Sequence, residues 1–316
     1  MSKKMQSSLL LLIAAFIWGS AFVAQRSGMA YIGPLTFMFF RSLLACLFLA
    51  AVYAISRAKA RKAQVLSGES AVSGQPSHAY RKHTLAGGIS CGVVLFAASL
   101  LQQYGLVTVS AGKTGFITAL YLALVPIFAA FLGKKPRIIH VICVPIALLG
   151  LWLLNMKGAS LSIGRGEFLD FLCAIGFAWH ILFVDRFSAS INGVLLSLMQ
   201  FTVCTILSFV GMLLFETPSM PAVASCFVSI AYAGLLSSGI AFTFQILAQK
   251  HIEPTVACFL MSLESVFSVL SGWLVLHEHL NLRELSGCAI VFAAVLLSQL
   301  ASSRQPVADA ADDSRW

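Results

Sequence analysis

A single carboxylate, Glu264, lies near the middle of an apolar stretch, Glu253–Glu278, that is long enough to cross a bilayer. A charge at that depth in a membrane is costly and seldom lacks a role. The carboxyl can exchange a proton or pair with the amine of a substrate. Alternatively, it stays protonated, or caps a neighbouring helix, and fixes the packing. Residue type and position leave both hypotheses open.

Three more titratable groups lie within apolar runs. Arg41 occurs in LTFMFFRSLL, where a guanidinium suits an anionic group of a ligand. It can equally snorkel, or bond backbone carbonyls between helices. His180 is a possible proton relay with Asp170 as its partner, although a lone intramembrane histidine is more often a packing residue.

Polar and aromatic residues recur at helical spacing in several apolar runs. For any one of them, an interhelical hydrogen bond of about 0.6 kcal/mol is the simpler explanation. As a set they favour a cavity for a small polar or zwitterionic solute. The predicted substrate-binding residues are Trp18, Gln25, Ser99, Gln103, Tyr104, Thr118, Tyr121, Trp179, His180, Ser238, Gln245 and Glu264, and the predicted coupling or charge residues are Glu264 and Arg41.

The composition places these groups in a membrane protein. The 316 residues are 59% hydrophobic and only 10% charged, whereas soluble proteins carry about 25% charged residues. The net charge of +9 is spread between apolar runs, without a basic helix or an aromatic platform, which argues against nucleic acid as a partner. The eight cysteines show neither CxxC nor zinc spacing, so we expect no disulfide, no metal and no cofactor.

Spanning helices need about 20 mostly apolar residues each. Ten segments qualify, which predicts an all-α polytopic membrane protein that has lipid and a small molecule as its partners. The segments are Ser8–Gln25, Leu35–Ile55, Thr84–Val107, Ala111–Leu132, Ile138–Met156, Gly166–Asp185, Val194–Phe215, Ala222–Ala248, Pro254–Leu276 and Leu280–Ala301.

The distribution of basic residues predicts the orientation. With the N-terminus in the cytoplasm, most of the 21 Lys and Arg residues fall on the cytoplasmic side, which places both termini inside a cytoplasmic (inner) membrane. The connection 56–83 reads as a flexible cytoplasmic loop, and the tail 302–316 as disordered.

A short pattern occurs twice. Leu124-Val125-Pro126-Ile127-Phe128 and its following Gly133 match Leu263-Glu264-Ser265-Val266-Phe267 and Gly272 at a constant offset. Five helices per half is an odd number, so the second half enters the membrane inverted. The sequence thus predicts a 5+5 inverted repeat, with halves 1–157 and 158–301, as in many transporters.

Several motifs together resemble the EamA-type branch of the drug/metabolite transporter superfamily. They are Trp18-Gly19-Ser20, Arg41 and the Leu-Glu-Ser-Val-Phe…Gly-Trp…His-Glu run that contains Glu264. The resemblance covers residues 8–301 and implies transport of small polar metabolites, often amino acids. That family usually has Glu-Pro where this chain has Glu264-Ser265, so the residue that usually kinks this helix is missing.

These observations predict a secondary transporter, an exporter of a small polar organic metabolite by alternating access, with possible coupling to protons. An enzyme is not expected. The alternative is an intramembrane enzyme that uses Glu264, His180 or Asp170 for acid–base chemistry on a lipid-linked substrate. Such an enzyme needs two catalytic groups within hydrogen-bond reach of one reacting atom.

Overall fold

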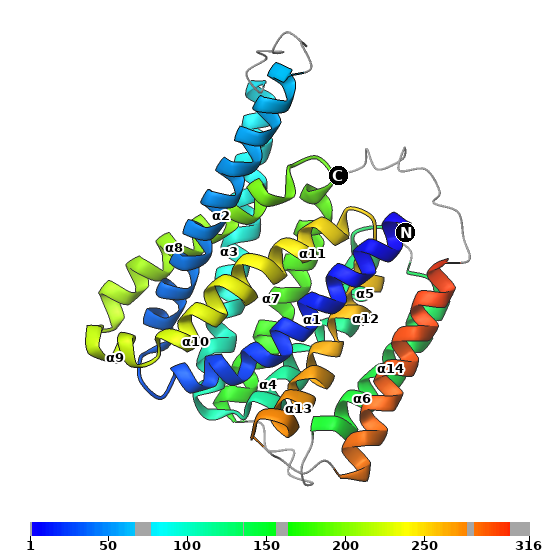
Figure 1. The fold of residues 1–316 in the computed structure, drawn as a ribbon. Helices are drawn as coiled ribbons and strands as arrows, with labels where there is room; N and C mark the ends of the chain where they lie inside the picture. The colour runs from blue at the N-terminus through cyan, green and yellow to red at the C-terminus, as the bar shows by residue number, and fades with distance from the viewer. Residues whose placement is uncertain (1, 67–76, 135, 156–163, 277–280, 304–316) are drawn as a thin grey trace.

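The computed structural model describes residues 2–66, 77–134, 136–155, 164–276 and 281–303. Within these ranges the regular structure is helical throughout (Figure 1). The elements are α1 (Lys3–Gly28), α2 (Pro34–Leu66), α3 (His78–Thr108), α4 (Ala111–Thr118), α5 (Tyr121–Phe131), α6 (Ile138–Asn155), α7 (Arg165–Ser188), α8 (Gly193–Phe215), α9 (Met220–Ser225), α10 (Phe227–Ala231), the π-helix η1 (Tyr232–Ala241), α11 (Phe242–Gln249), α12 (Pro254–Met261), α13 (Leu263–Leu276) and α14 (Leu282–Ser303).

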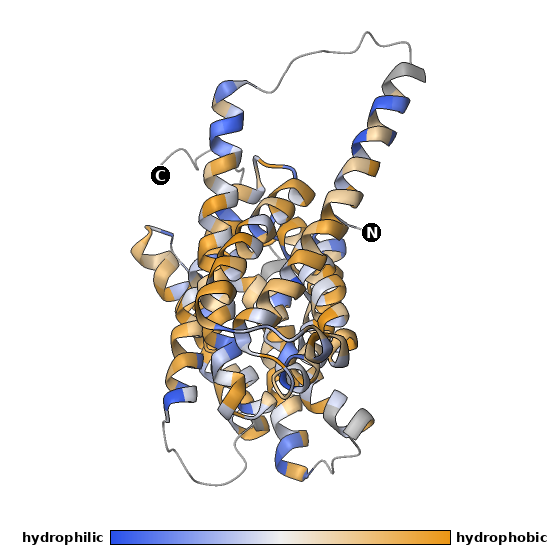
Figure 2. Ribbon diagram, turned by 90° about the vertical axis from the view of Figure 1, so that its left-hand side faces the viewer, coloured by the Kyte–Doolittle hydropathy of each residue, from blue (hydrophilic) through white to orange (hydrophobic). Residues whose placement is uncertain are grey.

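The described helices can cross a membrane. Nine of the helical runs are long and apolar enough to span it, and Ile138–Leu154 is a shorter apolar helix. Large apolar side chains such as Phe131, Phe215 and Val228 are exposed on the outside of the bundle. Figure 2 shows this apolar body, with hydrophilic segments gathered toward its two ends. The prediction of an all-α polytopic membrane protein is confirmed.

The expectation that residues 56–83 form a flexible loop is wrong for part of this segment. Instead of forming a loop from residue 56, α2 continues to Leu66, and α3 already begins at His78 (Figure 1). The reason is composition, because Arg, Ala, Lys, Gln and Leu are all strong helix formers. The Ser/Gly-rich piece of the predicted loop, 67–76, lies outside the described residues, as does 304–316 of the predicted tail.

Two of the predicted spans are interrupted helices. The span predicted over Ala111–Leu132 is broken at Ala119 and Leu120. Around this break the amides of Leu120, Leu122 and Ala123 bond carbonyls three residues back rather than four. Pro126 supplies a cause, since its ring crowds the carbonyl of Leu122 four residues earlier.

The span that contains Glu264 is interrupted as well, at Ser262, although it has no proline there. The hydroxyl of Ser262 donates to the carbonyl of Phe259 at 2.8 Å, a local bond that competes with helix geometry. Ser265, at the position where a proline is missing, donates to the Gly115 carbonyl of α4 at 3.2 Å. The helix is therefore interrupted without the proline that usually kinks it.

The helices pack in a recurring set of pairs. α3 lies against α7 and α8, while α1 lies against α13, η1 and α11; α2 pairs with α8, and α6 with α14. The start of α2 is held by the acid that follows α8. The Glu216 carboxylate accepts hydrogen bonds from the amides of Leu35 and Thr36 at 2.9 and 2.8 Å, and so caps the N-terminus of α2.

Two ion pairs join α4 and α5 to α7 at opposite ends. Lys113, near the start of α4, contacts Glu167 near the start of α7 at 2.7 Å. Lys134, just after α5, contacts Asp185 near the end of α7 at 2.6 Å. The run α4–α5 therefore lies parallel to α7 and is joined to it by an ion pair at each end.

Candidate functional site

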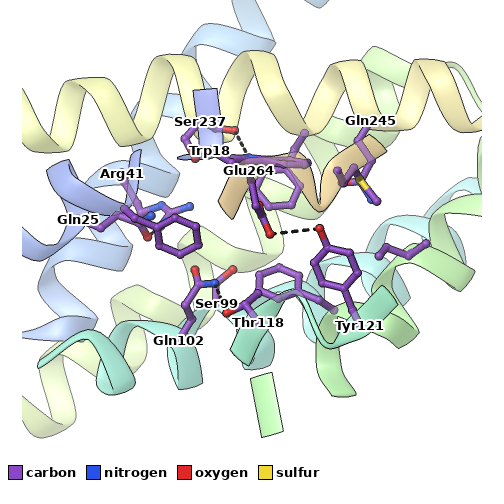
Figure 3. A pocket seen from close by; sticks show the side chains of 15 residues that line it. Trp18, Gln25, Arg41, Ser99, Gln102, Thr118, Tyr121, Ser237, Gln245 and Glu264 are labelled. Carbon is purple, nitrogen blue, oxygen red and sulfur yellow. Dashed lines mark hydrogen bonds between the residues drawn. The ribbon is translucent and has the colours of Figure 1, made fainter. Parts of the chain in front are cut away.

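A cavity lies where seven of the helical runs meet, and we call it the central cavity (Figure 3). The space between its side chains is about 510 Å³, part of which is open to the outside. Its lining residues are Trp18, Phe22, Gln25, Arg41, Ser99, Gln102, Thr118, Tyr121, Phe177, Ile181, Ser237, Phe242, Gln245, Met261 and Glu264.

Glu264 reaches the cavity from the first turn of α13. Its side chain is buried, and it accepts one hydrogen bond, from the phenol of Tyr121 at 3.1 Å (Figure 3). Tyr121 begins α5, so this bond connects the two interrupted helices. The helix that carries Glu264 is held close to α1 at Gly19, where an added Cβ would lie 2.5 Å from the carbonyl oxygen of Glu264.

Arg41 enters the cavity from α2. It is only 4% exposed, and its Nη1 donates to Gln25 Oε1 at 2.7 Å while its Nε donates to Ser238 Oγ at 3.2 Å. None of the ion pairs in the described part of the chain includes Arg41 or Glu264. A buried guanidinium and a buried carboxyl thus face one cavity, each bonded only to neutral groups. Burial without an opposite charge is unfavourable, so each charge can be completed by a ligand.

Aromatic rings form much of the remaining wall. Trp18 packs edge-on against Phe242, with ring centroids 4.8 Å apart, and its indole N–H donates to the Ser237 carbonyl at 3.3 Å. Phe22 and Phe177 also line the cavity. The site therefore combines two charged groups and several amides and hydroxyls with apolar surface, a mixture suited to an amphipathic organic molecule.

Eight of the predicted site residues lie together on the cavity wall: Trp18, Gln25, Arg41, Ser99, Thr118, Tyr121, Gln245 and Glu264. Five do not line it. Trp179 stacks on Phe128 with ring centroids 5.1 Å apart, and His180 is buried and bonded to Gln200 at 3.1 Å. Ser238 lies behind Arg41 as its hydrogen-bond acceptor.

The remaining two predicted residues, Gln103 and Tyr104, lie on α3 but point away from the cavity because of their position around the helix. Gln103 is fully buried away from the cavity, and Tyr104 is 39% exposed on the outside of the bundle. Gln102 takes the place predicted for Gln103, and it donates to Thr118 at 3.1 Å. Ser237 similarly takes the place of Ser238. Spacings of three and four residues both fit a helical stripe, so the pattern alone does not choose between these neighbours.

The proposed partnership of His180 with Asp170 is wrong. The two residues lie ten positions apart on α7, about 15 Å along a helix. His180 contacts Gln200, whereas Asp170 contacts Thr114 at 2.8 Å. Neither residue lines the central cavity.

Comparison with known proteins decides the family. The model of the EamA-like transporter family matches residues 5–156 and again residues 164–300. The chain belongs to the EamA-like transporter family. It is therefore a multi-pass membrane transporter, which sits in a lipid bilayer and binds a small-molecule substrate.

Relatives of this EamA-like transporter carry names of the same kind. An uncharacterized transporter of Archaeoglobus fulgidus is 24% identical over 302 residues, covering 94% of this chain and 87% of the relative. The uncharacterized transporter YoaV of Bacillus subtilis is 23% identical over 299 residues, covering 92% and 96%. A solved crystal structure has the same fold, with a TM-score of 0.73 at 19% identity, covering 94% of this chain and 98% of that one.

Proposed function

We propose that this EamA-like transporter exports a small zwitterionic metabolite, an amino acid or a close relative, through the central cavity. The observation that carries the proposal is the pair of buried opposite charges, Arg41 and Glu264, on one cavity wall. A substrate carboxylate would bind the guanidinium, and a substrate ammonium would bind the Glu264 carboxylate. The aromatic wall would cover an apolar side chain.

Alternating access between two related halves is the proposed mechanism. Two separate matches to the family model support the halves. The helix packing supports them too. Helix α3 of the first half packs against α7 of the second, and η1 and α11 of the second half pack in the same way against α1 of the first, as expected if α1 corresponds to α7 and α3 to η1 and α11. The interrupted runs α4–α5 and α12–α13 would correspond in the same way. A site between inverted halves can open to either side as the halves rock.

The intramembrane enzyme is the weaker candidate. It requires a second catalytic group beside Glu264. Asp170 and His180, the groups that the sequence offers for this role, bond to Thr114 and Gln200 away from the cavity.

The test compares metabolites inside and outside cells that express the wild type, Glu264→Gln, or an empty vector. A zwitterion that accumulates outside only with the wild type supports the proposal and identifies the solute. Equal profiles, with both proteins present in the membrane, contradict export. Purified protein in liposomes then checks the assignment by exchange of internal for labelled external solute.

A further inference from the structure

A second buried carboxyl, Asp170, lies at the junction of α3, α4 and α7, outside the central cavity. Its side chain has no exposed surface. Oδ2 accepts a hydrogen bond from the Thr114 hydroxyl at 2.8 Å, while Oδ1 has no hydrogen-bond partner among the residues that the structure describes. A buried polar atom without a partner is rare and calls for an explanation.

The backbone of α3 packs directly against Oδ1. Oδ1 packs against Gly105 of α3 so closely that even a Cβ at that position would collide with it. An added Cβ at Gly166 of α7 would likewise collide with Thr108 Oγ1, so α3 and α7 approach each other here through glycines. A metal cation needs several oxygen ligands around an open centre. A proton needs no such space.

In the described part of the chain, Asp170 has no counter-ion. Lys113 of α4 is engaged by Glu167, one turn before Asp170 on α7. On α7 itself, Arg165 and Cys173 are the other titratable groups nearby, and α3 contributes Tyr104, which points outward. Elsewhere along α7, the packed helices α5 and α12 contribute Tyr121 and Cys258, and the described part of α11 has no titratable side chain.

We propose that Asp170 is a proton-binding site that couples the pH gradient to transport. In the arrangement described here the carboxyl is closed off from water, and only its neutral form fits there without a large cost. The carboxylate fits an arrangement in which α3, α4 and α7 separate and water enters. Protonation therefore selects between two arrangements at this end of the bundle.

α4 provides the connection to the central cavity. Thr114 on one turn binds Asp170, Thr118 on the next turn lines the cavity, and Tyr121 after the break binds Glu264. In the cycle, a proton from the more acidic side joins the Asp170 carboxylate to give the neutral acid, and the same proton leaves toward the other side while the solute moves the opposite way. This scheme rests on the proposed function.

The first experiment needs no solute. Infrared difference spectra of the purified full-length protein between acidic and alkaline pH should contain a carboxylic-acid C=O band that Asp170→Asn diminishes. The matched control is Asp185→Asn, on the same helix but ion-paired with Lys134, which should keep that band. Identical pH-dependent bands in wild type and Asp170→Asn would overturn the proposal.

The second experiment separates coupling from transport. Liposomes loaded with neutral amino acids exchange them for labelled external ones, and an acidic interior is then imposed. One proton per solute allows at most about tenfold accumulation per pH unit. We expect Asp170→Asn to keep exchange and lose accumulation, and Glu264→Gln to lose both. If Asp170→Asn accumulates solute as strongly as the wild-type protein, the proposed coupling is refuted. If the wild-type protein shows no exchange, the proposed function is refuted, while the infrared test of Asp170 still stands.

If Asp170→Asn fails to fold, Thr114→Val replaces it, because valine keeps the shape of threonine and removes the hydroxyl. Loss of that hydrogen bond should shift the pH at which the infrared band appears. An unchanged pH would overturn the proposal.

Discussion

The phenol of Tyr121 donates a hydrogen bond to the carboxyl of Glu264, with 3.1 Å between the oxygens, and so joins α5 to α13 across the central cavity. Tyr121 is the first residue of α5 and Glu264 is the second residue of α13, so both lie just after the interruption of their own helix. A contact between two such points can report on a ligand between them, because the bond must change when a cation approaches the carboxyl.

Tyr121→Phe tests whether this bond tunes the binding site. The substitution keeps the ring and removes the donor, and a hydrogen bond to a charged group contributes about 1.5–3 kcal/mol. We expect solute exchange in liposomes to fall about tenfold, with unchanged protein abundance. Because both residues act in one unit, Tyr121→Phe should add little loss on top of Glu264→Gln. Independent, additive losses would show that Tyr121 acts separately.

Glu264→Gln distinguishes binding from packing. Glutamine has nearly the same shape but lacks the charge, so a substrate ammonium loses its partner. We expect transport to drop at least about tenfold, the effect of 1.4 kcal/mol, while the amount of protein in the membrane changes less. Quantitative immunoblots of membranes beside the transport assay provide the comparison. Parallel losses of both would assign Glu264 to packing.

Arg41→Lys tests the guanidinium. Lysine keeps the charge but carries all its donors on one nitrogen, whereas the arginine donates from separate nitrogens to Gln25 and Ser238 and still faces the cavity. We expect KM for the solute to rise about tenfold, as one lost charge-assisted bond implies. Arg57→Lys, on the exposed extension of α2, is the matched control and should leave KM unchanged. Unaltered KM in Arg41→Lys would limit Arg41 to holding helices together.

Two glycine substitutions should have opposite effects on stability. An added Cβ at Gly19 would meet backbone of α13, the Glu264 oxygen at 2.5 Å and the Ser268 nitrogen at 2.8 Å, so Gly19→Ala forces α1 and α13 apart at a cost of about 1–3 kcal/mol. At Gly115 the nearest atom, in the Phe22 ring, is 3.5 Å away, and alanine gains about 0.5–1 kcal/mol in a helix. Thermal unfolding in detergent should show a lower Tm for the first variant and an equal or higher Tm for the second. A tolerated Gly19→Ala would refute the close approach.

The predicted orientation places both termini in the cytoplasm. Cysteines at two exposed positions, Tyr31 between α1 and α2 and Arg61 on the extension of α2, should then react from opposite sides of the membrane. In a background without reactive native cysteines, we expect Tyr31→Cys to label in intact cells and Arg61→Cys only after permeabilisation. The reverse pattern would invert the topology.

Hydropathy was sufficient to predict the helical class, because lipid-facing surface requires long apolar runs whatever the details of packing. It was insufficient at residues 56–66, where polarity suggested a loop although helix propensity extends α2 to Leu66. Interruption of the Glu264 helix was also missed, since serine back-bonding at Ser262 has no sequence signal as clear as a proline.

Within the site, the charged residues were predicted correctly from residue type, whereas helical spacing did not reliably predict which neighbouring polar residues line the cavity. Glu264 and Arg41 are unusual in apolar runs, and both face the cavity. Gln103 and Ser238 were each displaced by the residue before them. For Ser238 a physical cause is at hand: it lies in η1, whose π-helical turns are wider than the α-helical period that places residues on a stripe.

The ion pairs at the two ends of α7 have a consequence for how a cavity of this kind can open. The run α4–α5 consists of two short helices separated by a break at Ala119 and Leu120. Each half has its own ion pair to α7, Lys113–Glu167 at the start and Lys134–Asp185 at the end. If α4–α5 were one continuous rigid helix, moving one end away from α7 would also strain the ion pair at the other end. The break in this run would allow one ion pair to separate while the other stays formed, which is what the proposed alternating access requires.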